Sequence, residues 1–252
     1  MSKIVLISGA SRGIGATIAK GLLSDGYRVV ATARKVSDLD DLGDHPSLLK
    51  LALDVTSEAS VQDCVDRVEQ TWGPVEILIN NAGIAQSAPL HKTTDEMWEQ
   101  QIAVNLTGSF RLTRKTLGKM KTLSFGRIIF IASIAGLAGS LYTSAYCASK
   151  HGVIGMMRAL ALEVAGTQGK VTANAVCPGF VETDMAYAAI DKIQQSTQRS
   201  ADDAKKALEA YSPQKRLMQA DEILHATRFL ISEYAKGVNG QAITVDGGEV
   251  MH

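Results

Sequence analysis

The chain has 252 residues, of which 46% are hydrophobic and 21% are charged. This composition indicates a folded protein with a sizeable core and excludes a disordered chain. The 26 basic and 26 acidic side chains balance, so no global charge attracts nucleic acids or anionic membranes, and we expect a small-molecule ligand.

Seven apolar runs, separated by helical segments, predict the strands of a parallel sheet. Several runs are continuously apolar, as expected when helices cover both faces of a sheet. Helical periodicity ending at a glycine covers 13–26 and 60–73, and longer helical patterns cover 95–123 and 144–166. The predicted strands are 3–8, 28–33, 48–54, 75–80, 126–133, 171–176 and 241–246.

The repeated strand–helix order predicts one α/β domain over residues 1–252, with a Rossmann-type doubly wound parallel sheet. No linker, repeat or low-complexity block divides the series. Residues 183–218, between the sixth and seventh strands, interrupt the strand–helix alternation, because this polar segment has no obvious core face. We interpret it as a substrate lid, with a solvated excursion as the alternative.

A glycine-rich turn follows the first strand directly. The stretch "SGASRGIG" places Gly9, Gly13 and Gly15 before a helix. Glycines at such a turn let backbone amides approach a pyrophosphate, and the helix N-terminus favours its negative charge. A bare tight turn is the alternative, since the spacing is GxxxGxG and not the commoner GxGxxG. Its position after the first strand favours a nucleotide site.

The end of the second strand indicates which dinucleotide binds. The acidic residue that contacts the adenosine ribose in this pattern is absent, and Ala33 and Arg34 stand there instead. Together with Arg12 from the glycine turn, Arg34 supplies guanidinium groups suited to a phosphate ester. This predicts NADP(H) as the cofactor, with solvated surface charges as the alternative interpretation of both arginines.

Tyr146 and Lys150 lie four positions apart in a stretch of small residues, so on a helix they share one face. A phenol can protonate the alkoxide left by hydride transfer to a ketone, provided its pKa falls from about 10. We expect the Lys150 ammonium to lower it, and Ser133 to donate a hydrogen bond to the substrate oxygen. An amphipathic surface contact is the alternative for the pair.

Together these motifs resemble the short-chain dehydrogenase/reductase family in its single-domain form. The resemblance covers nearly the whole chain and rests on SGASRGIG at 8–15, NNAG at 80–83, NLTG at 105–108, Ser133, YCASK at 146–150 and PGFVETDM at 178–185. It implies four catalytic residues, namely Asn105, Ser133, Tyr146 and Lys150. In the family's pattern Asn105 holds a water that relays protons to Lys150, whose amine also binds a cofactor ribose.

The resemblance also implies the cofactor contacts. Asp54 and Val55 are expected near the adenine, Asn81 to Gly83 under its ribose, and the motif after the sixth strand at the nicotinamide end. The predicted cofactor-binding residues are Gly9, Ser11, Arg12, Gly13, Ile14, Gly15, Arg34, Asp54, Val55, Asn81, Ala82, Gly83, Tyr146, Lys150, Pro178, Gly179, Val181 and Thr183. Phe180 and Met185 are predicted to contact the substrate.

The cysteines and the N-terminal residues indicate the cellular compartment of the protein. Cys64, Cys147 and Cys177 form no CxxC pair and have no histidine at ligand spacing, so neither a disulfide framework nor a metal site is expected. Cys147 is expected to pack and not to act as a nucleophile. The first apolar run is too short for a signal peptide or a membrane span. We therefore expect a cytoplasmic protein.

These residues predict an NADPH-dependent reductase acting on a ketone, and 144–185 most resembles 3-oxoacyl thioester reductases and polyketide ketoreductases. One alternative is a dehydrogenase that oxidises a secondary alcohol or hydroxy acid with the same residues. Another is a nucleotide-sensing scaffold, which does not need the four catalytic residues together. Family members are commonly tetramers, so a homotetramer is expected, with 243–252 contributing to its contacts.

Overall fold

Seven parallel strands form one sheet in the computed structural model, which describes residues 2–198 and 200–251. The strands are β1 Ile4–Ile7, β2 Arg28–Ala33, β3 Leu48–Ala52, β4 Ile77–Asn80, β5 Gly126–Ile131, β6 Val171–Pro178 and β7 Ala242–Val245. Their order is β3-β2-β1-β4-β5-β6-β7, which confirms the Rossmann-type doubly wound fold. The order reverses between β1 and β4, and ligands of such sheets bind outside the carboxyl ends of the strands at this point.

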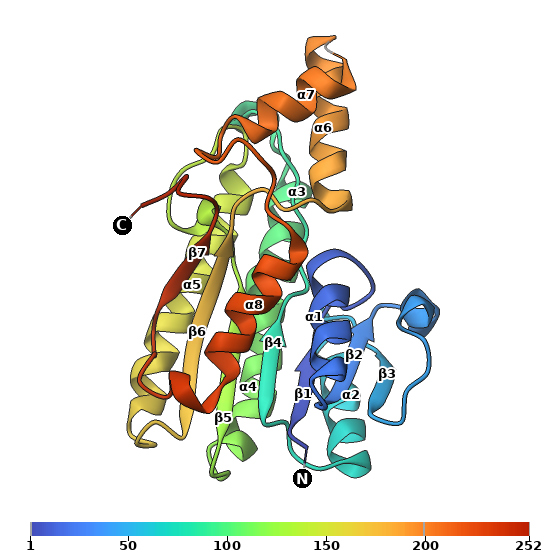
Figure 1. Cartoon of the computed structure of the whole chain (residues 1–252), viewed down its shortest axis with the longest axis vertical. Helices are drawn as coiled ribbons and strands as arrows, with labels where there is room; N and C mark the ends of the chain where they lie inside the picture. The colour runs from blue at the N-terminus through green and yellow to red at the C-terminus, as the bar shows by residue number, and fades with distance from the viewer. Residues whose placement is uncertain (1, 199, 252) are drawn as a thin grey trace.

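Helices cover both faces of the sheet, with α1 and α8 in front and α2, α4 and α5 behind (Figure 1). Leu6 of β1 packs in the cluster that includes α2, α4 and α5, whereas its neighbours Val5 and Ile7 pack with α1 and α8. Successive strand residues point to opposite faces, which explains the continuously apolar runs. The helices are α1 Gly13–Ser24, α2 Glu58–Thr71, α3 Asp95–Gln101, α4 Gly108–Met120, α5 Ser144–Ala165, α6 Asp184–Thr197, α7 Ala201–Glu209 and α8 Ala220–Ile231, with short 3₁₀ helices at Val36–Leu42, Leu90–Lys92, Ile134–Gly136 and Glu233–Ala235.

The long helix predicted over 95–123 is interrupted. A π-helical stretch, Ile102–Thr107, separates α3 from α4 and contains Asn105. Such π-helical turns insert a residue into an α-helix and are frequent at functional sites. Hydrophobic periodicity does not reveal them, because the apolar face continues on both sides.

The segment between β6 and β7 forms a hairpin of α6 and α7 that projects beyond the carboxyl ends of the strands (Figure 1). The expectation that it lacks a core face is wrong. Apolar positions recur at helical spacing in both helices, and these residues pack together as Ala186, Ile190, Ala204, Leu208 and Leu217, with Phe180 and Ile193 beside them. Arg199, in the same segment, lies outside the described residues.

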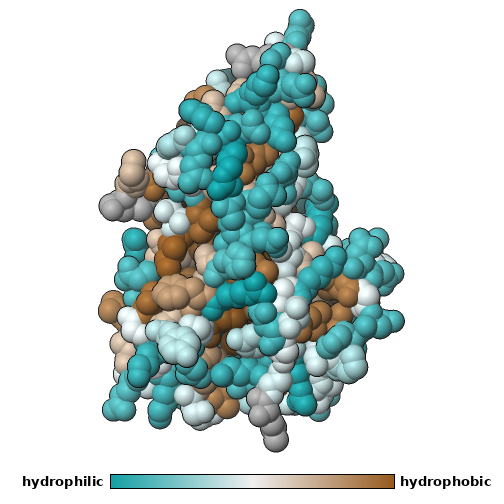
Figure 2. All heavy atoms as spheres, in the orientation of Figure 1, coloured by the Kyte–Doolittle hydropathy of each residue, from teal (hydrophilic) through white to brown (hydrophobic). Residues whose placement is uncertain are grey.

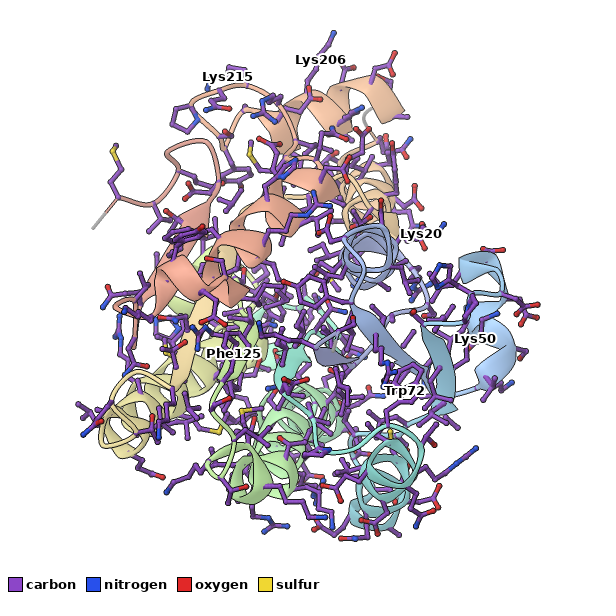
Figure 3. The ribbon with its side chains drawn as sticks, turned by 60° about the horizontal axis from the view of Figure 1, so that its bottom comes forward. Lys20, Lys50, Trp72, Phe125, Lys206 and Lys215 are labelled. Carbon is purple, nitrogen blue, oxygen red and sulfur yellow. The ribbon has the colours of Figure 1, made fainter. Side chains whose placement is uncertain are left out.

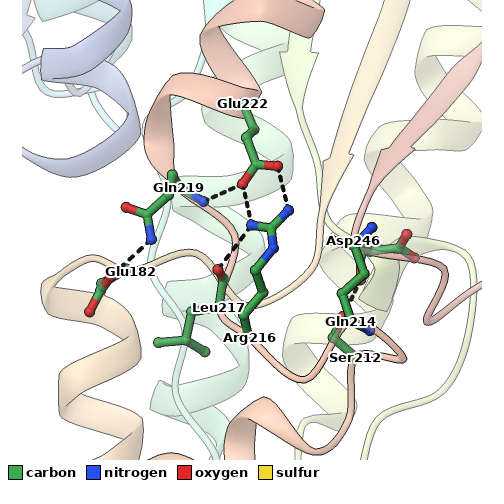
Figure 4. A network of polar contacts seen from close by, with 8 residues as sticks. All are labelled: Glu182, Ser212, Gln214, Arg216, Leu217, Gln219, Glu222 and Asp246. Carbon is green, nitrogen blue, oxygen red and sulfur yellow. Dashed lines mark hydrogen bonds and ion pairs between the residues drawn. The ribbon is translucent and has the colours of Figure 1, made fainter.

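The base of this hairpin is held by Glu182, whose side chain contacts α6, α7 and Gln219, and Figure 4 shows the contact with Gln219. Its carboxylate accepts hydrogen bonds from Tyr187 Oη at 2.8 Å, Lys205 Nζ at 3.1 Å and Gln219 Nε2 at 2.9 Å. These donors, led by Gln219, lower the pKa of Glu182 to about 2. The hairpin is thereby tied to the residue that caps α8.

The amino ends of the strands come forward in Figure 3, where Phe125 is labelled. A buried arginine of β5 packs against the ring of this residue. Arg127, in β5, is 1% exposed, and its guanidinium lies 4.2 Å from the centroid of the Phe125 ring. It donates hydrogen bonds to the carbonyl oxygens of Gly126, Lys170 and Ser232 at 2.8 to 3.4 Å. Arg127 therefore joins β5 to the segments that precede β6 and follow α8.

Candidate active site

The glycine turn between β1 and α1 packs directly on the segment after β4. Gly9 has φ +69°, and a Cβ there would lie 2.9 Å from the Cα of Ala82. A Cβ on Gly15 would collide with the carbonyl oxygen of Gly9. Only glycine fits this close approach, which brings the turn and the NNAG motif together at the switch point of the sheet.

Ser8 and Asn81 hold this packing in place. The Ser8 hydroxyl accepts hydrogen bonds from the backbone N–H groups of Asn81 and Ala82, both at 3.0 Å. Asn81 Nδ2 donates in turn to the carbonyl oxygens of Ser8 at 3.0 Å and Gly9 at 2.7 Å. The Asn81 amide thus supports the glycine turn, and any contact of this residue with a cofactor uses its other atoms.

Ser133, Tyr146 and Lys150 are brought together at the carboxyl end of β5. Ser133 begins the 3₁₀ helix after β5, and its Oγ accepts a hydrogen bond from the Ala135 N–H at 3.1 Å. Half-buried Tyr146 lies in the first turn of α5, where its side chain interacts with Ser133. One turn further, Lys150 Nζ lies 5.6 Å from the centroid of the Tyr146 ring. The helical spacing therefore places the pair as the sequence predicts.

Lys150 is buried under the loop that follows β4. Its Nζ donates to the carbonyl oxygen of Ile131 at 2.9 Å, and a Cβ on Gly83 would lie 3.7 Å from it. Burial lowers the pKa of Lys150 to about 8. An ammonium has three donors, so the bond to Ile131 leaves donors for a ligand hydroxyl.

The expected effect of Lys150 on the phenol is wrong in this structure. Burial raises the pKa of Tyr146 to about 12, and the interaction with Ser133 lowers it only in part. Moving a phenolate out of water costs more than one hydroxyl contact returns. Burial also makes the charged form of Lys150 less favourable than it is in water. The phenol is therefore protonated at neutral pH.

Asn105 connects the loop after β4 to the helix that carries Tyr146. Its Oδ1 accepts from the Ile84 N–H at 2.9 Å, and its Nδ2 donates to the Ile84 carbonyl and to Ser149 Oγ, both at 3.0 Å. Ser149 Oγ donates to the carbonyl oxygen of Tyr146 at 2.7 Å. Ser149 was not among the residues predicted from the sequence, although its place beside Lys150 within YCASK points to it.

Arg12 and Arg34 are exposed side chains near the carboxyl ends of β1 and β2. Arg12 precedes α1, and its NH1 lies 3.5 Å from the Asp184 carboxylate in the first turn of α6. With Ser11, Gly13 and Thr183, Arg12 lines a cleft of about 310 Å³ between α1 and the base of the hairpin. Both predicted phosphate ligands are therefore accessible, and Arg12 also contacts α6.

The predicted adenine-side residues lie in the turn after β3. Asp54 Oδ1 accepts from the Thr56 N–H at 2.9 Å and the Thr56 hydroxyl at 2.7 Å. These hydrogen bonds, helped by Arg34, hold the pKa of Asp54 below its usual value. Val55 is buried, and a Cβ on Gly108 would lie 2.7 Å from its Cγ2.

The motif after β6 returns the chain to the glycine turn. The Gly179 N–H donates to the Val245 carbonyl at 3.1 Å, and Val181 pairs with Met218. A Cβ on Gly13 would lie 3.3 Å from the methyl group of Thr183. The glycine turn and the motif after β6 therefore lie side by side.

The predicted substrate contacts differ in exposure. The Phe180 ring is partly buried against the hairpin, with its centroid 5.9 Å from that of Tyr211. Met185 is 48% exposed. Both lie at the base of the hairpin, and their contact with substrate stays a prediction.

Comparison with known proteins identifies the family to which this chain belongs. Residues 3–194 match the family model for the short chain dehydrogenases. The chain belongs to this family. Its members are oxidoreductases with a nicotinamide cofactor, so the interpretation as a scaffold without chemistry is wrong.

The proteins found include both reductases and dehydrogenases. The chain is 39% identical to the 3-oxoacyl-(acyl-carrier-protein) reductase MabA of Mycobacterium tuberculosis, over 100% of this chain and 94% of the relative. It is 38% identical to the corresponding reductase FabG of Escherichia coli, over 99% and 98%. A structure of a variant of actinorhodin polyketide ketoreductase with NADPH superposes with a TM-score of 0.92, at 36% identity, over 98% of this chain and 97% of that one.

Across 2–198 and 200–251, no group of three or more histidine, cysteine, aspartate or glutamate side chains is placed to hold a metal ion. None of the helices in these ranges combines the length and apolar character needed to cross a bilayer. Cys64, Cys147 and Cys177 are free thiols.

Proposed function

We propose that this protein is an NADPH-dependent reductase of 3-oxoacyl thioesters or similar ketones, with Tyr146 as the general acid. The carrying observation is that Tyr146, Ser133 and Lys150 meet at the carboxyl end of β5, with Lys150 Nζ 5.6 Å from the centroid of the half-buried Tyr146 ring. The pKa of the phenol is raised, so it is protonated at neutral pH. A protonated phenol is the form that reduction of a ketone requires. The names of the relatives support this substrate class, and the NADPH in the ketoreductase structure supports the cofactor.

The residues present at the carboxyl edge of the sheet fit a dinucleotide. The close packing at Gly9 and Gly13 leaves backbone amides and the N-terminus of α1 to face a pyrophosphate. Lys150 has donors for a ribose hydroxyl, and the segment from Pro178 to Thr183 borders the nicotinamide end. NADPH supplies the hydride when it is bound.

The chain's own groups then handle the substrate oxygen and the proton. Ser133 donates a hydrogen bond to the carbonyl oxygen and so stabilises the charge that develops there. Tyr146 delivers its proton to that oxygen. Asn105, through Ile84 and Ser149, holds the loop after β4 against α5, and the water relay expected at Asn105 would return a proton through Lys150.

A kinetic comparison of substrates and cofactors tests this function. NADPH oxidation with acetoacetyl and longer 3-oxoacyl thioesters should be steady, and oxidation of the matching 3-hydroxyacyl thioesters with NADP⁺ slower at neutral pH. Faster oxidation than reduction at neutral pH would favour the alternative, an alcohol dehydrogenase. No turnover with any ketone or alcohol would contradict both.

The cofactor preference rests on Ala33, Arg34 and Arg12. The double substitution Ala33→Asp with Arg34→Ala should invert the preference from NADPH to NADH, because a carboxylate repels the added phosphate and binds a free ribose hydroxyl. Loss of a charge-assisted hydrogen bond corresponds to about tenfold in affinity. The measurement is kcat/KM with each cofactor at moderate salt. If the parent used NADH and NADPH equally well, neither arginine would bind the phosphate, and both would be solvated surface charges.

We treat residues 1–252 as one domain, in which the α6–α7 hairpin acts as the lid expected over 183–218. Its position beyond the carboxyl ends of the strands supports this role (Figure 1). The ion pair between Arg12 and Asp184 joins the hairpin to the predicted phosphate site.

A homotetramer is the assembly we propose. β7 is an edge strand, and a groove of about 780 Å³ runs along it, lined by Ile243, Val245 and Val250 among others. Apolar side chains gather in this region between α8 and the C-terminal end (Figure 2). His252, the last residue of the expected contact segment, lies outside the described residues. Light scattering should give the mass of four copies, and a monomeric mass would contradict the assembly.

A further inference from the structure

Tyr142 has a backbone conformation that tyrosine rarely adopts. Its φ is +63°, in the left-handed region that favours glycine. Within the described ranges, the other non-glycine residues with positive φ are polar or charged, namely Gln168, Gln198 and Lys215. Strain of this kind persists where the surroundings fix it, and it clusters at functional sites.

A hydrogen bond between two loops fixes this conformation. The Ala88 N–H donates to the Tyr142 carbonyl oxygen at 2.8 Å. Ala88 follows β4 and Tyr142 follows β5, and these strands are neighbours in the sheet. The bond therefore joins the two loops that leave the sheet at the candidate active site.

Tyr142 also sets where the catalytic helix starts. It precedes Thr143, the N-cap residue of α5, by one position and Tyr146 by four. The Cys147 N–H donates to the Thr143 carbonyl at 2.7 Å, so the first turn of α5 begins immediately after the strained residue. The backbone of Tyr142 thus leads directly into the helix that carries Tyr146.

Three large apolar side chains are exposed around this hydrogen bond. Tyr142 is 54% exposed, Leu141 69% and Leu90 71%, and each lies within two residues of Ala88 or Tyr142. A glycine at 142 would make the same backbone bond without strain. The exposed ring, and not the turn, is therefore the property that tyrosine adds here.

We infer that Tyr142 is a specificity-determining residue whose ring, with Leu90 and Leu141, binds the apolar part of the substrate beyond the ketone. The inference rests on the proposed reductase function and narrows its substrate class to ketones with an apolar chain or ring system. Burial of apolar surface at the rim then lowers the KM of long substrates relative to short ones.

The test compares chain lengths in the parent and in three variants. Tyr142→Gly and Tyr142→Asn remove the ring and tolerate the left-handed conformation, and Tyr142→Phe is the matched control that keeps the ring. Steady-state kcat and KM are measured with NADPH and the N-acetylcysteamine thioesters of acetoacetate and 3-oxododecanoate. Thermal unfolding of each variant reports whether it folds.

In the parent, we expect a lower KM for 3-oxododecanoate than for acetoacetate. The Gly and Asn variants should raise the KM for the long substrate by about tenfold and leave that for the short one unchanged. The KM values of Tyr142→Phe should match those of the parent. The Tm of Tyr142→Gly should be no lower than that of the parent.

Three results would overturn the inference: a parent KM that does not depend on chain length, an equal KM increase for both substrates, or a change in kcat alone. The dependence of the parent KM on chain length is measured without any variant. The inference can therefore be refuted even if the variants do not fold. Absence of any ketone reduction by the parent contradicts the proposed function instead.

Discussion

At the scale of single residues, burial has a larger effect on the site than the arrangement of charges. The sequence places Tyr146 and Lys150 on one helical face, because the four-residue spacing is a property of the helix. The pKa of Tyr146 depends on how far α5 packs against the ends of the strands, which is a property of the tertiary structure. The sequence pattern therefore predicts that Tyr146 and Lys150 lie together. It predicts a lowered pKa for Tyr146, whereas burial raises it.

Substitution of Tyr146 by phenylalanine removes only the hydroxyl group. Turnover of ketones should fall by about 10² to 10⁴-fold, because the proton donor is lost, while the Kd for NADPH stays within about twofold. Tyr234→Phe is the matched control, since Tyr234 is 95% exposed. Stopped-flow kinetics and fluorescence titration of NADPH measure the two quantities. Comparable activity of Tyr146→Phe and Tyr234→Phe would refute the assignment of the general acid.

The pH dependence of the two directions should differ. Reduction uses the protonated phenol, whose pKa of about 12 predicts a rate that is independent of phenol titration near neutral pH. Oxidation of an alcohol needs the phenolate, whose fraction rises about tenfold per pH unit below that pKa. The rates are measured from about pH 6 to 9. A plateau of the oxidation rate near neutral pH would restore the expectation that Lys150 acidifies the phenol.

At the scale of elements, the strands follow from local pattern and the helical interruptions do not. All seven predicted strands correspond to observed ones, and β2 has the predicted bounds, because strands buried on both faces need continuous apolar residues. The π-helical stretch at Ile102–Thr107 has no such signature, since the contacts of Asn105 that it permits are tertiary. The core face of the hairpin was missed because its cluster is small and built partly from alanines, Ala186 and Ala204.

Hydrogen exchange tests the hairpin as a lid. Residues 184–198 and 200–209 should exchange faster in the free protein than in the complex with NADPH and a ketone analogue, because closure orders a segment packed around a small cluster of its own. Asp184→Asn should weaken this protection by NADPH, since it removes the ion pair with Arg12, and Asp191→Asn on the same helix is the control. Equal protection in the free and ternary forms would contradict the lid.

At the scale of the whole molecule, the carboxyl ends and the amino ends of the strands serve different purposes. The residues assigned to chemistry lie at the carboxyl edge, where the glycine turn, the loop after β4 and the start of α5 meet. At the opposite edge, Arg127 is buried among carbonyl oxygens from three segments, and its hydrogen bonds join elements that are far apart in the chain. Changes at this edge should therefore alter stability without altering catalysis.

Replacing Arg127 with methionine tests that separation. The substitution keeps much of the side-chain volume but removes the guanidinium donors to the carbonyls of Lys170 and Ser232, and the loss of hydrogen bonds from a charged group costs about 1 to 3 kcal/mol. For a chain of this size the Tm should fall by roughly 2 to 12 °C, while kcat/KM at low temperature stays as in the parent. Arg67→Met, at a side chain that is 55% exposed, should leave both unchanged. A loss of kcat/KM in a folded Arg127→Met protein would show that the amino edge of the sheet positions the active site as well, because β5 runs from Arg127 directly to the residues that precede Ser133.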